Sequence, residues 1–185
     1  MLERHASRAT RRAREFEAFV AGAAGRLLHA ATLLTAESPD DNPRARRLLT
    51  RSLAHTYACW DRLHGEDPYD HTRRQLAIRF ARGAWHHHGV LGRSRPHPAS
   101  PLAPLTPQER LILVLRLHEG VAEEQTAALL GLSPERVRAI SHRATSALLH
   151  RSRGPGARGV AREGDAMSPA DGRPAGGRPA GGRPA

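Results

Sequence analysis

The chain has 185 residues and a formal net charge of +11, from 29 basic against 18 acidic side chains. All of the basic residues are arginines, whose planar guanidinium pairs with phosphate or a guanine edge, so the charge favours a nucleic-acid partner. A genome rich in G and C would also raise arginine over lysine, so the sign of the charge carries more weight. The single cysteine, Cys59, excludes an internal disulfide and a cysteine-rich zinc site. No apolar run predicts a membrane span or signal peptide, so we expect a cytoplasmic protein.

Apolar residues recur at spacings of three and four, which predicts an all-α chain without a sheet. Residues 1–13 are rich in arginine and lack this period, so we expect a disordered basic arm there. A first helical domain, residues 14–85, then holds three helices. Asn42 and Asp67, each followed by proline, predict the starts of the second and third of these helices.

Two further segments lack the pattern of a packed helix. Residues 86–104 contain several of the fourteen prolines and predict a flexible linker. Residues 151–185 consist largely of Gly, Pro, Arg and Ala and end in three copies of GRPA. Such a composition cannot build a core, so we expect a disordered tail, whose arginines could add loose attraction to phosphate. Replication slippage in GC-rich DNA is the alternative origin of the repeat.

The sharpest pattern lies in residues 105–150. Thr106 and Glu109 have the spacing of a capping box, which predicts a helix that starts there and ends near Gly120. A short helix over 122–130 and a turn through Gly131 then lead to a third helix with Ser133 as its cap. Helix, tight turn and capped helix together predict a helix-turn-helix domain.

Helical geometry separates the two faces of the last helix. At 100° per residue, the packed side carries Val137, Ile140, Ser141, Ala144 and Leu148. The opposite side and its flanks carry the candidates for contact with DNA: Arg136, Arg138, His142 and Arg143. Such side chains suit the major groove, where arginine grips guanine O6 and N7. The alternative is the ordinary solvated face of an amphipathic helix.

Residues 105–149 read LTPQERLILVLRLHEGVAEEQTAALLGLSPERVRAISHRATSALL and resemble region 4 of extracytoplasmic-function sigma factors. Residues 15–85 resemble region 2 of the same family, most of all in its actinobacterial SigE-like branch, through EFEAFVAGAAGRLLHAATLLT, ARRLLTRSLAHTYACW and DPYDHTRRQLAIRFARGAW. The resemblance implies a nucleoid-associated subunit that binds RNA polymerase core and directs it to promoter DNA. Region 4 would read the upstream promoter element, and region 2 would bind core and help to open the downstream one.

One departure from the family puts core binding in doubt. The second helix of region 2 usually opens with an acidic pair that helps to grip the β′ clamp, but here Arg46 and Arg47 hold those positions, with Leu49 after them. The reversed charge could abolish ordinary core binding or redirect it. Two alternatives therefore stay open: a sigma-like DNA-binding regulator without normal core contacts, and a protein that mainly binds a partner such as an anti-sigma factor.

The third helix carries the candidates for contact with an opened DNA strand: Arg73, Arg74, Arg79, Arg82 and Trp85. Arginine contacts to the backbone and stacking of a base on the indole suit strand opening, whereas a packed Trp85 and solvated arginines are the alternative. Residues 86–88 are three histidines that point about 100° apart on a helix, which disfavours a shared metal. We therefore expect no metal. Since the sequence has no nucleotide-binding glycine loop, HExxH or Ser-His-Asp arrangement, we also expect no cofactor and no enzyme activity, and Cys59 is expected to be a small apolar residue.

Overall fold

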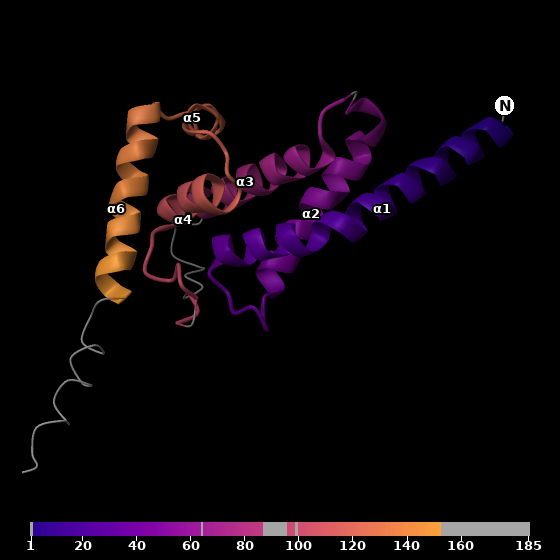
Figure 1. Ribbon diagram of the computed structural model, residues 1–185. Coiled ribbons are helices and arrows are strands. Elements are labelled where there is room, and N and C mark those ends of the chain that lie inside the picture. Colours follow the sequence, from indigo (N-terminus) through magenta and orange to yellow (C-terminus); the bar gives the residue numbers. More distant parts are fainter. Residues whose placement is uncertain (1, 64, 87–95, 99, 153–185) are drawn as a thin grey trace, which may run out of the picture. The chain divides into compact units, whose positions relative to one another are not determined.

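The computed structural model describes residues 2–63, 65–86, 96–98 and 100–152, and these contain helices and turns but no strand (Figure 1). The predicted all-α class is confirmed. The helices are α1 (Leu2–Thr35), α2 (Pro43–Cys59), α3 (Pro68–His86), α4 (Pro107–Leu113), α5 (Glu123–Leu130) and α6 (Pro134–Ser152), with a 3₁₀ turn η1 (Trp60–Arg62) and a π-helical turn η2 (Val114–His118).

Helices α1, α2 and α3 share an apolar core that the predicted stripe supplies. Leu27, Ala31 and Leu34 of α1 are at most 2% exposed. They pack with Leu49 of α2 and Leu76 of α3. Full burial of one such side chain stabilises a fold by about 1.5–3 kcal/mol, so this cluster holds the three helices together.

The N-terminal segment differs from the expected disordered arm, because α1 begins at Leu2 and runs through residues 2–13 without a break. These residues include neither glycine nor proline, and alanine and arginine are good helix formers. Arg12 adds a long-range anchor. Its Nη1 lies 3.2 Å from Oδ2 of Asp61, and its guanidinium lies 4.7 Å from the centre of the Tyr57 ring.

The start of α2 is capped by a residue that the sequence analysis did not choose. Asn42 holds the N-cap position, but its side chain makes no capping hydrogen bond and donates instead to the carbonyl of Pro39. The carboxylate of Glu37 accepts from the backbone amides of Arg44 and Ala45, at 3.0 and 2.8 Å. This negative charge offsets the arginines near the positive end of the helix dipole.

The predicted caps of the helix-turn-helix segment are confirmed. Oγ1 of Thr106 accepts from the amide of Glu109, and the carboxylate of Glu109 accepts from the amide of Thr106, which makes a capping box. Gly131 ends α5 in the left-handed conformation with φ of 66°. The hydroxyl of Ser133 accepts from the amide of Arg136 in the first turn of α6.

The two helical blocks, α1–α3 and α4–α6, belong to one compact unit that extends to Ser152. Leu111, Val114 and Leu115 join the core of the first block. Of the predicted linker, residues 87–95 and 99 lie outside the described residues, while the amide of His97 donates to the carbonyl of Ala36 at 2.8 Å. Of the predicted tail, residues 151–152 continue α6 and the rest lies outside the described residues.

Within the described residues, α1 is long and apolar enough over Ala6–Thr35 to cross a membrane by those two criteria, since one 18-residue window of it has a mean hydropathy of 1.3. The sequence analysis found no such stretch. The apolar stripe of this helix is, however, the core described above, with Leu27 and Ala31 fully buried. A core helix of a soluble protein meets the same criteria, so they carry little weight here.

Candidate nucleic-acid interface

Helix α6 is anchored by the face that the sequence predicted. Val137 and Ala144 are fully buried and Ile140 is 4% exposed. Val137 and Ile140 pack with Ile112 of α4 and Ala127 of α5. The two preceding helices thus fix the rotation of α6 about its own axis and decide which side chains reach solvent.

The outer face of α6 carries all four predicted DNA-contacting residues, and each of them is exposed: Arg136, Arg138, His142 and Arg143. Two of these are oriented by acids of the supporting helices. Arg138 contacts Glu123 of α5 through two hydrogen bonds, of 2.8 and 3.3 Å. Arg143 donates from Nε to Glu109 of α4 at 3.1 Å. The two arginine side chains remain 63% and 66% exposed, and exposed ion pairs contribute at most about 1 kcal/mol, so phosphate can compete for both.

The predicted strand-contacting residues of α3 have different surroundings. Arg73 pairs with Asp70 at 3.1 Å, and Arg74 pairs with Glu66 at 2.7 Å. Nε of Arg79 is buried without a hydrogen-bond partner in the described part of the chain. Arg82 is exposed, and the side chain of Trp85 lies outside the described residues.

The predicted core-polymerase contacts at the start of α2 also differ from one another in exposure. Arg46 and Arg47 are exposed, and Arg46 donates from Nε to Oδ1 of Asn42 at 2.9 Å. Leu49 is only 7% exposed and belongs to the core of the first block. Its side chain therefore packs inside the molecule and does not contribute to a surface, which corrects the sequence prediction for this residue.

Comparison with known proteins identifies the family of the chain and assigns its second block. Residues 102–150 match the family described as Sigma-70, region 4. Over 153 residues the chain is 30% identical to the RNA polymerase sigma-E factor of Streptomyces coelicolor, covering 72% of this chain and 84% of that protein. The chain is a sigma factor of the sigma-70 family, in its extracytoplasmic-function group. No solved structure matches it. Helices α4–α6 are thus the DNA-binding helix-turn-helix of this sigma factor.

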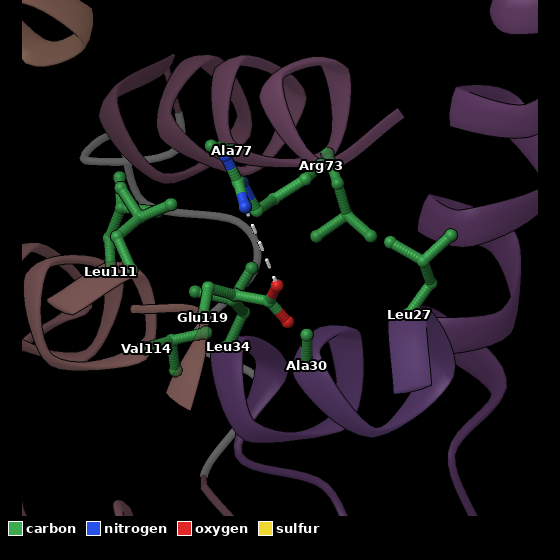
Figure 2. Close-up of a pocket in the computed structure, with 10 residues that line it drawn as sticks. Leu27, Ala30, Leu34, Arg73, Ala77, Leu111, Val114 and Glu119 are labelled. Atoms are coloured by element: carbon green, nitrogen blue, oxygen red, sulfur yellow. Dashed lines mark ion pairs between the residues drawn. The ribbon is translucent and has the colours of Figure 1, made fainter. Parts of the chain in front are cut away.

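In this sigma factor, a buried carboxylate links the two blocks, and the sequence analysis missed it. Glu119, directly after η2, has a side chain that is 1% exposed. It accepts hydrogen bonds of 2.9 and 3.1 Å from the hydroxyl of Tyr69 on α3. Arg26 of α1 and Arg73 of α3 lie 3.6 and 4.0 Å from its Oε2, and Figure 2 shows Arg73 reaching across to it.

The surroundings of Glu119 also affect two neighbouring groups. Burial, followed by the hydrogen bond to Glu119, raises the pKa of the Tyr69 hydroxyl, which stays protonated as a donor. Burial lowers the pKa of His118 although Glu119 lies 3.5 Å from its Nε2. Burial therefore favours the neutral form of His118, and Arg26 and Arg73 bring positive charge next to Glu119. No local signal in the sequence indicates this cluster, because its members are 46 to 93 residues apart from Glu119.

Proposed function

We propose that this sigma factor directs RNA polymerase core to promoter DNA, with the outer face of α6 reading the promoter duplex. The observation that carries the proposal is the division of α6 into a buried side around Val137 and Ile140 and an exposed side with Arg138 and Arg143. In the major groove, a guanidinium can bond guanine O6 and N7 together, and other arginines can bond phosphate. The acids Glu123 and Glu109 support this role by orienting the two arginines in the free protein.

Duplex binding by the full chain tests the α6 interface. We expect the double substitution Arg138→Ala/Arg143→Ala to weaken binding by about 10-fold to 100-fold and to reduce the dependence of log Kd on log salt. The matched control is Arg11→Ala/Arg14→Ala, which removes the same charge from exposed positions of α1. Equal binding by the two variants would contradict a role for α6.

The start of α2 is proposed to lie at the contact with core polymerase, where the exposed Arg46 and Arg47 weaken binding. The family resemblance implies an acidic pair at the positions of Arg46 and Arg47, so Arg46→Asp/Arg47→Asp restores the expected charge. We expect this variant to retain more core polymerase in co-purification than the natural chain does, with Arg11→Asp/Arg14→Asp as the control for net charge. Run-off transcription with the retained core then measures initiation directly.

The reversed charge on α2 favours a second candidate, a sigma-like DNA-binding regulator that does not engage core in the ordinary way. Arg46 and Arg47 are exposed, and Arg44 beside them is already paired with Glu37 at 3.0 Å. If the natural chain binds duplex DNA but neither retains core nor supports run-off transcription, this second candidate replaces the first. The outcome separates the two, because only the first requires both activities.

The remaining proposals concern strand opening, localisation and a further partner. The candidates for contact with an opened strand are the five predicted residues of α3, Arg73, Arg74, Arg79, Arg82 and Trp85, of which Arg73 and Arg74 would exchange their acidic partners for phosphate. Permanganate footprinting of a promoter complex tests this, and Trp85→Ala should reduce strand opening without reducing duplex binding. We place the protein in the cytoplasm at the nucleoid, without enzyme activity, and an anti-sigma factor is a further partner to test by co-purification.

A further inference from the structure

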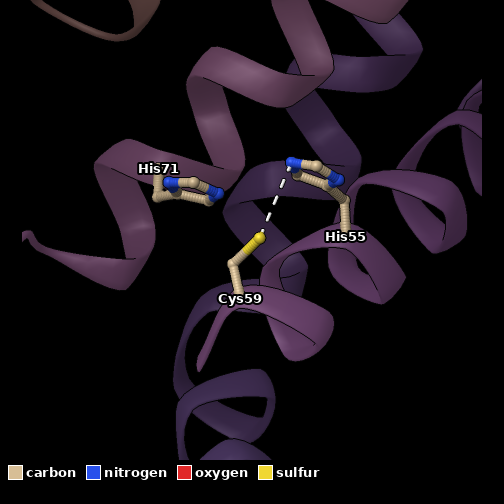
Figure 3. A group of neighbouring side chains, drawn as sticks. All are labelled: His55, Cys59 and His71. Carbon is tan, nitrogen blue, oxygen red and sulfur yellow. Dashed lines mark hydrogen bonds between the residues drawn. The ribbon is translucent and has the colours of Figure 1, made fainter. Parts of the chain in front are cut away.

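Three side chains with metal-binding atoms come together between α2 and α3 (Figure 3). His55 and Cys59 lie one turn apart on the same face of α2, and His71 approaches from α3. One nitrogen from each histidine and the sulfur of Cys59 all lie within 4.8 Å of one another. Nε2 of His55 is 3.9 Å from Sγ of Cys59.

The environment of His71 is an independent sign of a missing ligand. Its Nδ1 lies 3.2 Å from Oε2 of Glu66, while its Nε2 is buried and has no hydrogen-bond partner among the described residues. A bond from Nδ1–H to the carboxylate leaves the lone pair of Nε2 free. Metal-binding histidines commonly have this arrangement, in which a carboxylate fixes the ring through the nitrogen that does not bind the metal.

We propose that His55, Cys59 and His71 bind a zinc ion, with the fourth coordination position left to water. Two imidazole nitrogens and one thiolate are ligands that zinc accepts in tetrahedral geometry. Bond lengths in such a site place the ligand atoms roughly 3.3–3.6 Å apart, so atoms now up to 4.8 Å apart need to close by as much as about 1.5 Å. The two imidazole rings lie nearly parallel with their centres 5.7 Å apart, so metal binding also requires them to rotate until both lone pairs face the ion. The inference does not depend on the proposed function.

Two arginines close to the group lower the expected affinity. Nη2 of Arg62 donates to Sγ of Cys59 at 3.4 Å and brings its positive charge next to the site. Arg62 and Arg79 also direct positive charge at His55, which opposes a dication. We therefore expect binding weaker than that of sites with four protein ligands, and reversible on chelation.

Cobalt(II) titration of the full chain tests the site. Because the chain has one cysteine, a thiolate-to-cobalt charge-transfer band reports binding at Cys59 alone. We expect one equivalent of cobalt to give this band together with the visible bands of tetrahedral cobalt, and one equivalent of zinc to remove both. Zinc should also raise the Tm of the natural chain, because an ion that binds only the folded state stabilises it.

Variants decide which residues bind. Cys59→Ser should abolish the band and the zinc-dependent rise in Tm, and His55→Ala and His71→Ala should each lose the band at one equivalent of cobalt. His150→Ala, on the exposed end of α6, is the matched control and should retain it. Alanine substitution of histidines 86–88 should also retain it, which separates the site from that run. Circular dichroism establishes that each variant is folded. A natural chain that gives no charge-transfer band, or folded His55→Ala and His71→Ala variants that keep it, would overturn the proposal.

Discussion

At the scale of the residue, single carboxylates stabilise this molecule by accepting hydrogen bonds from backbone amides at helix starts and from arginine side chains. Glu37 accepts two backbone amides at the start of α2, and Glu109 completes the capping box of α4 while it pairs with Arg143. Burial alone would raise the pKa of Glu37, but the amides of Ala45 and Arg44, with the Arg44 guanidinium, hold it below its usual value. The ionised form of this group therefore stabilises the fold.

We expect Glu37→Gln to lower the free energy of unfolding by about 1–2 kcal/mol at pH 7, because glutamine carries no charge and keeps an acceptor for the donors of only one carboxylate oxygen. Since the folded pKa of Glu37 is depressed, its contribution is complete above the unfolded pKa and is lost as pH falls through the folded pKa. The gap in Tm between the natural chain and the variant should therefore narrow in acid. Glu17→Gln, at an exposed position of α1, is the control; a gap that widens in acid would contradict this account.

At the scale of the element, helix ends explain what the sequence alone could and could not predict. Thr106, Gly131 and Ser133 act on backbone within a few residues, so spacing alone located the ends of α4, α5 and α6. The start of α1 and the cap of α2 depend on more distant partners. Arg12 meets Asp61 49 residues later, and Glu37 reaches amides 7 and 8 residues ahead.

The candidate sites follow the same rule. The exposed face of α6 was predictable from helical geometry, because one helix carries the whole set around Arg138 and Arg143. The group of His55, Cys59 and His71 could be predicted only in part. His55 and Cys59 have the spacing of one helical turn, which the sequence analysis did not use. His71 comes from the next helix, and no periodicity within a single helix indicates which side chain of a neighbour will face it.

Helix α5 begins without the side-chain cap that α4 and α6 have, since Ala122 holds its N-cap position. The backbone there, with φ of −59° and ψ of 154°, has the extended shape that a capping serine prefers. With Gln125 three residues later, Ala122→Ser creates the spacing of a capping box.

We therefore expect Ala122→Ser to raise the free energy of unfolding by about 1 kcal/mol, measured by urea denaturation. Thr50→Ala, in the middle of α2, is the control for an exchange between alanine and a hydroxyl residue and should have a small effect. If Ala122→Ser leaves stability unchanged, the amides at the start of α5 are satisfied without a side chain.

At the scale of the whole molecule, Glu119 is the polar link between the two helical blocks. Its side chain is almost fully buried and meets Tyr69, Arg26 and Arg73, which all belong to the first block. Apolar contacts of Leu111, Val114 and Leu115 surround the link. The two blocks are therefore joined by the polar contacts of Glu119 and by the apolar contacts that surround them.

Loss of the Glu119 carboxylate should lower the stability of the whole molecule. We expect Glu119→Ala to lower the free energy of unfolding by about 2 kcal/mol or more, because the Tyr69 hydroxyl loses its acceptor and two arginines lose their ion-pair partner. Tyr69→Phe should have a smaller effect, since it removes one hydrogen bond and keeps the ring. Glu124→Ala, exposed on α5, is the control. Equal stability of Glu119→Ala and Glu124→Ala, measured by thermal unfolding, would show that the apolar contacts alone join the blocks.

The acids that hold the α6 arginines have one more consequence, because they occupy the same donors that a nucleic-acid backbone would use. Glu123 competes with phosphate for the donors of Arg138. A duplex of random sequence has to displace Glu123 from these donors to use them, so weak and non-specific binding is reduced. Glu123→Gln should then bind unrelated duplex more tightly than the natural chain while its preference for a promoter over random sequence falls. Fluorescence anisotropy with the two duplexes would measure that loss of discrimination, and an unchanged ratio would mean that the carboxylate only positions its partner.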